Sequence, residues 1–405
     1  MIDDSKLAGL IGPELTPAYI FDVEEAVSRA ESIKGSIREC SEEYPPGLCF
    51  SVKANPFLVP VLKDTVDYFE VCSPGELAIC RHHEIPGEKI IYSGVQKESE
   101  DIEDAVLYPV SVITAESVRQ YELICQVTTL LQKRTEVILR LSSKSQFGMS
   151  LEDIGAILQV RGRHPDAVIS GIHYFAGTQR EKLKHREEEL KELKETFLFL
   201  RRQYDIPLRR FEYGPGLPYP YFQGDDFSDT LRPLKELLPA LTDIAGECIL
   251  TVEMGRFLAS SCGYYLTSVC DVKSSFGRNW CIVDGGIHHL NYLGQMMGMK
   301  LPVLRHFHRS ENGFDSVHPG DGPKQSWALC GSLCTTNDVL IRSIDLQKPA
   351  HGDVFVFCHC GAYSVTEAIA LFLSRDMPKI FLYQEGELRL IRDKVESWRM
   401  NCWHV

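Results

Sequence analysis

The chain has 405 residues, of which 44% are apolar and 24% are charged, and its formal net charge is −13. This composition supports a folded chain with a sizeable core and excludes an intrinsically disordered protein. The acidic balance and the lack of a basic stripe argue against a nucleic-acid partner, and no apolar run approaches the roughly 18 residues of a membrane span. The length predicts two domains, or one large barrel with an accessory domain.

The first residues, Met1–Lys6, are polar and acidic and lack the basic and apolar regions of a signal peptide. Together with fourteen cysteines, this start predicts a cytoplasmic protein whose thiols are reduced. The cysteine spacing shows no zinc-ribbon pattern. Cys358-His359-Cys360 fits either a metal site or a buried strand, and its alternation favours the strand.

The first two thirds of the chain alternate short strands with helices. Pro17–Asp22 is predicted to be a lone strand, and eight β-branched strands separated by helical patterns follow, which indicates a (β/α)8 barrel. The eight candidates are Leu48–Val52, Tyr68–Val71, Ile90–Tyr92, Val110–Ile113, Val137–Leu141, Ile169–Tyr174, Arg210–Tyr213 and Ile249–Glu253. The clearest helix pattern is Glu181–Arg202, where apolar residues recur at helical spacing among Lys and Glu.

After Ser260 the pattern changes to strands separated by turns, which predicts an all-β domain. Its candidate strands are Tyr264–Lys273, Trp280–Val283, Asp353–Phe357, Ile380–Tyr383 and Leu388–Arg392. The segment Arg305–Gln325, rich in His, Gly, Asp and Ser, is expected to be a long loop. We therefore predict a barrel domain at residues 23–262 and a β domain at 263–405, which the strand within residues 1–22 is expected to complete.

A single lysine ends the apolar strand in the run Phe50–Pro56, and Asn55-Pro56 then turns the backbone. This pattern places the amine of Lys53 at the carboxyl end of a strand, where α/β folds put their chemistry. A lysine held there among apolar neighbours can lose its proton and form a Schiff base with an aldehyde. From this run alone, a surface lysine before a loop is the alternative.

Lys53 is followed by further motifs in a fixed order. They are Glu70–Leu77, Gly171–Gln179, Gly214–Gly216, Glu253–Arg256, Cys334–Asp338 and Gly361–Tyr363. In this order they resemble the fold-type III pyridoxal-phosphate decarboxylases, which include the diaminopimelate, ornithine and arginine decarboxylases, over nearly the whole chain. The resemblance implies an alanine racemase-like α/β fold with a barrel and a C-terminal β domain. It also implies bound pyridoxal 5'-phosphate and a homodimer with both active sites at the subunit interface.

The resemblance assigns cofactor roles to residues of the barrel. Lys53 would carry the cofactor and later return a proton to the substrate carbon. Glu253 would face the pyridine nitrogen and keep it protonated, and a surface ion pair at the strand end is the alternative. In the glycine loop Pro215 lacks an N–H group, so Gly214, Gly216 or Leu217 is expected to donate to the phosphate.

Other family positions complete the predicted cofactor site. Thr178, Arg256 and Tyr363 match positions that approach the phosphate, and Glu70, His173 and Gly255 are further candidates. Phe175 stands where the family has a histidine stacked on the cofactor ring. A phenyl ring can still cover the ring face but cannot titrate. His173 is either part of the site or only a packed strand residue.

A third group of residues belongs to the predicted substrate site. In the family, the cysteine matched by Cys334 enters from the partner subunit and helps to protonate the product. Diamine-forming members carry an acid beside it that pairs with the distal ammonium of the substrate, and this chain has Thr335. Because an unpaired buried cation is costly, free lysine, ornithine and diaminopimelate are disfavoured. Asp338 and Tyr363 are further substrate candidates.

The predicted activity is decarboxylation of an amino acid or of a side-chain-conjugated amino acid, including one tethered to a carrier protein. The net acidity argues against an acidic carrier. The basic pairs Arg201-Arg202 and Arg209-Arg210 are either a docking patch for it or exposed helix charge. An amino-acid racemase on the same fold and a non-catalytic homologue that binds the cofactor are the alternatives.

Overall fold

The computed structural model describes residues 2–12, 14–292, 298–318 and 322–403. The chain divides into two compact units, which we call the barrel unit and the sheet unit. The barrel unit comprises residues 27–219 and 228–258, and the sheet unit comprises residues 1–26, 220–227 and 259–405.

Eight parallel strands close into a barrel in the barrel unit, which confirms the predicted fold class. The strands are β2 (Gly47–Ser51), β3 (Tyr68–Val71), β4 (Ile90–Tyr92), β5 (Val112–Ala115), β6 (Thr135–Arg140), β7 (Ala167–Phe175), β8 (Arg210–Gly214) and β9 (Ile249–Met254). Each pairs in register with its neighbour, and β9 pairs with β2 to close the ring. In a closed parallel barrel all carboxyl ends meet at one mouth, where active sites form.

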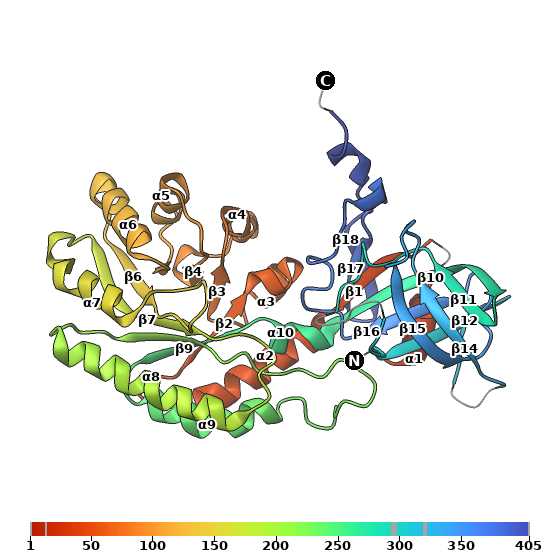
Figure 1. The fold of residues 1–405 in the computed structure, drawn as a ribbon, viewed down its shortest axis with the longest axis horizontal. Helices are drawn as coiled ribbons and strands as arrows, with labels where there is room; N and C mark the ends of the chain where they lie inside the picture. The colour runs from red at the N-terminus through yellow and green to blue at the C-terminus, as the bar shows by residue number, and fades with distance from the viewer. Residues whose placement is uncertain (1, 13, 293–297, 319–321, 404–405) are drawn as a thin grey trace. The chain divides into compact units, whose positions relative to one another are not determined.

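Helices alternate with these strands and cover the barrel (Figure 1). They are α2 (Val23–Arg38), α3 (Val59–Leu62), α4 (Pro74–His82), α5 (Ser99–Leu107), α6 (Val118–Leu131), α7 (Leu151–Val160), α8 (Leu183–Gln203), α9 (Arg232–Ala245) and α10 (Arg256–Ala259). Helix α8 confirms the helix pattern of the sequence, because Leu190, Leu193, Phe197 and Leu200 share one buried face.

A ten-stranded sheet forms the sheet unit, in the order β13-β12-β16-β10-β1-β17-β18, with β11, β14 and β15 branching from β10. Its elements are α1 (Asp4–Leu10), β1 (Ala18–Asp22), β10 (Gly263–Ser275), β11 (Arg278–Val283), β12 (Leu304–Ser310), β13 (Gly313–Ser316), β14 (Gln325–Cys330), β15 (Val339–Leu346), β16 (Val354–Cys358), β17 (Lys379–Gln384) and β18 (Glu387–Arg392). Strand β1 runs antiparallel to β10 and parallel to β17, so the N-terminal segment is a central strand of this sheet.

The prediction of a long loop at Arg305–Gln325 is wrong for the described part of that segment, while residues 319–321 lie outside the described residues. Strands β12 and β13 form a hairpin there. Its polar residues are partly buried in pairs: His306 Nε2 lies 2.8 Å and His308 Nδ1 2.9 Å from the two carboxylate oxygens of Asp353. Polar pairs of this kind hide a strand from a search for apolar alternation.

Three segments inside the predicted barrel range belong to the sheet unit, namely residues 23–26, 220–227 and 259–262. Tyr221 contacts the ring of Tyr292, and the amide of Gln223 donates to Leu301 O at 2.7 Å. Within the described residues, no helix has both the length and the apolar character needed to span a bilayer. Cys358 ends strand β16, and both Cys358 and Cys360 are buried.

Candidate active site

Lys53 lies just beyond strand β2, at the carboxyl mouth of the barrel. A 3-10 turn, Val52–Ala54, follows the strand, and Asn55 then caps a second turn that Pro56 begins. Proline fits the first position of such a turn because no N–H is needed there. The Lys53 side chain keeps 41% of its exposure, so its amine is accessible from the mouth.

A buried carboxylate holds the Lys53 amine. The amine donates to Glu70 on β3, with Nζ 2.9 Å from one carboxylate oxygen and 3.1 Å from the other. Cys72 Sγ lies 3.4 Å from the same nitrogen. Because Glu70 is buried, water screens this pair little, and the nitrogen is fixed in position.

Cys72 is a neighbour of Lys53 for which the sequence predicted no role. Burial raises the pKa of the Cys72 thiol well above its usual range, and the Glu70 carboxylate raises it further. Cys72 is therefore a neutral thiol at neutral pH. Its backbone amide donates to Glu76 Oε2 at 2.7 Å, which fixes the segment after β3.

A second buried pair joins β7 to β9. His173 Nε2 lies 3.3 Å from each oxygen of Glu253; it hydrogen-bonds Oε2, and Oε1 has no hydrogen-bond partner among the described residues. Burial alone would raise the pKa of Glu253, but His173, Glu212 and Lys53 outweigh it and hold that pKa well below its usual range. Glu253 is thus a buried anion, and its Oε1 can accept a hydrogen bond from a protonated ring nitrogen.

Phe175 and Gly214 lie beside this anion, paired across β7 and β8. A Cβ added to Gly214 would come within 2.5 Å of the Phe175 ring and 3.0 Å of Glu253 Oε2. Only glycine leaves room for both side chains. The phenyl ring at the predicted stacking position therefore borders the same space as the Glu253 carboxylate.

The loops after β7 and β8 touch through their backbones. Gly216 has φ +58°, and a Cβ there would approach Gly177 O to 1.8 Å. Arg180 N donates to Gly216 O at 2.9 Å, and the side chain of Gln179 binds both N and O of Tyr219. Glycine-rich strand ends of this kind let backbone amides approach a phosphate.

The remaining predicted barrel residues follow the same strand ends. Thr178 is exposed after β7, while Gly255 and Arg256 come directly after β9, with Arg256 buried at the start of α10. The barrel thus gathers at one mouth an accessible lysine, a buried anion with a free oxygen, an aromatic ring and a glycine cradle. These four groups match the four parts of a pyridoxal phosphate. The lysine suits its aldehyde, the anion its ring nitrogen, the aromatic side chain its ring face and the glycines its phosphate.

Sequence reasoning missed several buried charged residues near this mouth. Arg140 at the end of β6 forms an ion pair with Glu116, whose other oxygen accepts from Gly148 N at 3.2 Å. Lys97 is buried, donates to Thr114 O at 2.9 Å, and has its pKa lowered by burial to about 8. Glu212, inside β8, is the third. Each lies in or beside an apolar strand. A charged residue at such a position is the signal by which the sequence could have indicated a buried charge.

The predicted substrate residues belong to the sheet unit. Cys334 is exposed on the turn between β14 and β15. Asp338 is buried: its carboxylate accepts from Leu333 N at 2.7 Å and Ile287 N at 2.8 Å. Asp338 therefore holds the turn that presents Cys334 and Thr335. Tyr363 has φ +64°, a left-handed conformation that is uncommon for an aromatic residue.

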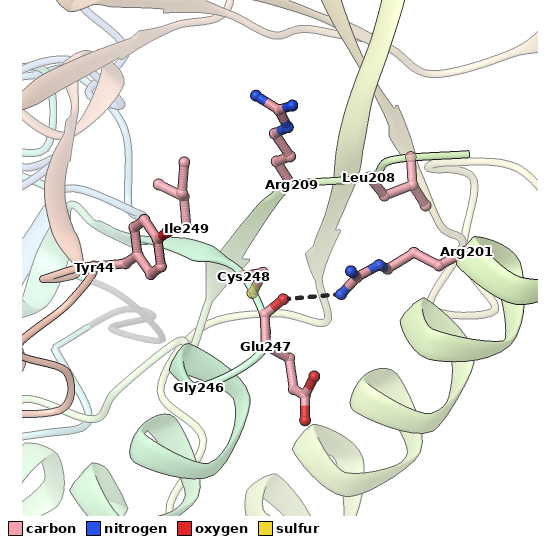
Figure 2. A pocket seen from close by; sticks show the side chains of 8 residues that line it. All are labelled: Tyr44, Arg201, Leu208, Arg209, Gly246, Glu247, Cys248 and Ile249. Atoms are coloured by element: carbon pink, nitrogen blue, oxygen red, sulfur yellow. Dashed lines mark hydrogen bonds between the residues drawn. The ribbon is translucent and has the colours of Figure 1, made fainter. Parts of the chain in front are cut away.

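The basic pairs lie at the other end of the barrel. Arg201 and Arg209 line a pocket of about 300 Å³ at the amino ends of β8 and β9, with Arg201 Nη1 donating to Glu247 O at 3.1 Å (Figure 2). Arg210 pairs with Glu136 at 2.7 Å. Lys53 follows the carboxyl end of β2, so these arginines do not border the mouth that contains it.

Comparison with known families identifies the barrel. Residues 30–260 match the family described as pyridoxal-dependent decarboxylase, pyridoxal binding domain. The chain is 26% identical to the L-glutamyl-[BtrI acyl-carrier protein] decarboxylase of Niallia circulans, covering 97% of this chain and 94% of that protein. It is 25% identical to the 2-[(L-alanin-3-ylcarbamoyl)methyl]-2-hydroxybutanedioate decarboxylase of Staphylococcus aureus, covering 91% and 94%.

Solved structures share the fold over most of the chain. A diaminopimelate decarboxylase from M. jannaschii superposes with a TM-score of 0.83 at 21% identity, covering 98% of this chain and 92% of the other. A lysine/ornithine decarboxylase from Vibrio vulnificus, complexed with cadaverine, gives 0.77 at 19% identity, covering 91% and 95%. At these identities the superpositions show a shared fold.

Proposed function

Because the chain belongs to the pyridoxal-dependent decarboxylase family, we propose that it removes CO2 from an amino acid whose side chain is conjugated to a second group. The observation that carries this proposal is the pairing of Lys53 with Glu70 and of Glu253 with His173 at one barrel mouth. The named relatives are decarboxylases, which favours this reaction over racemisation.

The residues at the mouth divide the binding of the cofactor between them. Lys53 holds the aldehyde carbon, Glu253 Oε1 accepts from the ring nitrogen, and Phe175 covers the ring. We assign the phosphate to the backbone N–H groups of Gly214, Gly216 and Leu217, with the side chains of Thr178, Arg256 and Tyr363 as further proposed donors. When bound, pyridoxal phosphate draws electrons from the breaking bond to the substrate carboxylate.

Proton transfer completes the reaction. Glu70 keeps the Lys53 nitrogen within reach of the reacting carbon, so that the freed amine can return a proton there. We assign the second donor to Cys334 of a partner subunit in a homodimer, because Cys334 is exposed on a turn that Asp338 holds rigid. We also propose a reducing, cytoplasmic location, because fourteen cysteines in a chain of this length are typical of reduced thiols.

The substrate class follows from Thr335. A threonine cannot pair with a distal ammonium, so a free basic amino acid would leave a buried cation uncompensated. Two relatives carry names that specify an acyl-carrier-bound and a carbamoyl-linked substrate. A substrate whose side chain is joined to a second group through a neutral amide or thioester has no distal ammonium. It therefore needs no carboxylate at position 335. A carrier protein would have to dock away from Arg201 and Arg209, which border the opposite end of the barrel.

A substrate screen tests the proposal. Purified protein with pyridoxal phosphate is incubated with free and side-chain-conjugated amino acids, and mass spectrometry follows the loss of CO2, with Lys53→Ala as control. We expect turnover of conjugated substrates by the native chain only. Robust turnover of free ornithine or lysine would refute the substrate class. Scrambled stereochemistry without CO2 release would instead establish a racemase.

A further inference from the structure

Glu212 is a buried carboxylate that the proposed reaction does not use directly. It lies inside strand β8 and is 2% exposed, and neither of its oxygens has a hydrogen-bond donor among the described residues. The nearest cation on its own strand, Arg210, bonds Glu136 on β6 instead, at 2.7 Å. An ionised carboxylate in this position would carry an uncompensated buried charge, which is strongly unfavourable.

Two other carboxylates of the barrel, Glu253 and Glu70, act on Glu212. Across β7 it is in register with His173, and across β9 with Thr251. Side chains two residues apart on a strand share a face, so Glu253 lies on the same inner face as Thr251. Besides Glu253, the titratable and charged groups that act on or respond to Glu212 are Glu70 on β3, Cys49 on β2 and Arg210 on its own strand.

A proton shared between Glu212 and Glu253 would remove the cost of burying two negative charges side by side. Two adjacent buried carboxylates cannot both ionise, and the proton resides on the one with fewer cations nearby. His173 hydrogen-bonds Glu253, and both His173 and Lys53 favour the charged form of Glu253. The side chains that act most strongly on Glu212 are instead the Glu253 and Glu70 carboxylates. Burial raises the pKa of Glu212 well above its usual range, and the Glu253 carboxylate raises it further.

We propose that Glu212 is a neutral carboxylic acid that donates a hydrogen bond to Glu253 and holds Glu253 as the single anion facing the cofactor ring nitrogen. Glu212 is thus a positioning residue that acts through Glu253. In this proposal Glu212 donates to Oε2, the oxygen that His173 also hydrogen-bonds, and Oε1 is left to accept from the ring nitrogen. The single negative charge of Glu253 then balances the positive charge of the protonated ring nitrogen. If Glu212 were also ionised, the site would carry an excess negative charge. This role in the reaction rests on the proposed function, but the position of the proton does not.

The substitutions Glu212→Gln and Glu212→Leu separate a hydrogen-bond donor from a charge. Glutamine keeps the size, the neutrality and an N–H donor, whereas leucine keeps only the bulk. In the full-length protein with its cofactor, we expect Glu212→Gln to retain kcat within about threefold. We expect Glu212→Leu to lose about tenfold or more, the effect of removing one buried hydrogen bond, and to bind pyridoxal phosphate more weakly. Thermal unfolding of both variants separates these effects from loss of folded protein.

Infrared spectroscopy reports the proton without reference to turnover. At pH 8 the native protein should show a neutral carboxylic acid band that is missing from Glu212→Gln and still present in a matched variant of an exposed acid, Glu152→Gln. Identical spectra for the native protein and Glu212→Gln would overturn the proposal, as would equal loss of kcat in the Gln and Leu variants. If no substrate is ever turned over, the band still decides the state of Glu212.

Discussion

Thr335 is the side chain on which our proposal for the substrate class rests. Its hydroxyl accepts from Asn337 N at 3.3 Å, so it is already part of the turn that presents Cys334. A carboxylate in its place would supply the charge that a distal ammonium requires. We therefore propose that the absence of a carboxylate at position 335 excludes substrates with a distal ammonium.

We predict that Thr335→Glu gains activity on free lysine or ornithine and loses activity on conjugated substrates. A new buried ion pair changes selectivity by about tenfold or more. The ratio of kcat/KM values for free and conjugated substrates measures the change, and Thr336→Glu, at the exposed neighbouring residue, serves as control. An unchanged ratio in Thr335→Glu would show that this side chain does not face the substrate.

Individual site residues differed in how well the sequence predicted them. Lys53 and Glu253 each lie in a short motif at a strand end, and both motifs match known family positions. Glu212 and Arg140 could not be found in this way. Alternation shows that a side chain points into a barrel, but it does not show which polar neighbour it meets there. Glu70 was predicted as a site residue, but its distance to Lys53 required the structure.

The loops after β7 and β8 are the elements to which we assign phosphate binding. Gly216 adopts φ +58°, and its Cα lies against Gly177 O with no room for a Cβ. Both the conformation and the contact require glycine. The backbone at Gly216 is therefore fixed, as our assignment of the phosphate to this loop requires.

We expect Gly216→Ala to lower the affinity for pyridoxal phosphate by about tenfold and to destabilise the fold by more than about 1 kcal/mol, because alanine is strained at positive φ. Gly162→Ala is the matched control, since nothing lies within 4 Å of a Cβ added there. Fluorescence titration with the cofactor and thermal unfolding measure the two effects. Native affinity in Gly216→Ala would contradict a phosphate role for this loop.

The segment after β11 holds two adjacent buried histidines, His288 and His289, whose ring centroids are 3.8 Å apart. Burial is the main cause that lowers the pKa of His288 to about 3 and that of His289 to about 4. Nearby positive charge also lowers both pKa values, while the hydrogen bond to Asp376 O partly offsets burial at His289. Below the unfolded pKa of about 6.5 the unfolded chain binds protons that the folded protein does not. Stability is therefore lost as pH falls from about 6.5 toward 4.

We predict that the free energy of unfolding falls by up to about 1.4 kcal/mol per pH unit for each of these histidines between pH 6 and 5. His288→Leu should flatten this slope, and His82→Gln, at an exposed histidine, should leave it unchanged. Urea unfolding at several pH values gives the slopes. Equal slopes in the native protein and His288→Leu would mean that this histidine is charged in the folded state.

Among the elements, the eight barrel strands could be predicted within a few residues because each is a short run containing aliphatic or aromatic residues between helical patterns. Strands β12 and β13 could not, because His306 and His308 are held by Asp353. Strand β1 was recognisable as a strand, but its position between β10 and β17 depends on contacts with residues more than 200 positions away. Such pairings leave no local signal.

The whole molecule is proposed to act as a dimer in which Cys334 of one subunit completes the site of the other. The closed barrel supplies the cofactor site, and the ten-stranded sheet carries the turn that presents the cysteine. Two inactive variants, one altered in each part, should therefore complement each other.

We expect a mixture of Lys53→Ala and Cys334→Ala subunits, co-expressed, to recover about one quarter of native activity, because about half of the dimers are mixed and each has one intact site. The separate variants should each have little activity, and mixing the same variant with itself is the control. Activity no higher than the average of the two separate variants would place Cys334 outside the partner's site.

The central claim is that the Lys53 amine carries the cofactor, and chemical trapping tests it most directly. The loaded protein is reduced with borohydride and digested, and the peptides are mapped by mass spectrometry. The pyridoxyl group should be found on Lys53 and be missing from a Lys53→Ala sample treated in the same way. A label on another lysine, or no label on the native chain, would contradict both the site and the reaction described here.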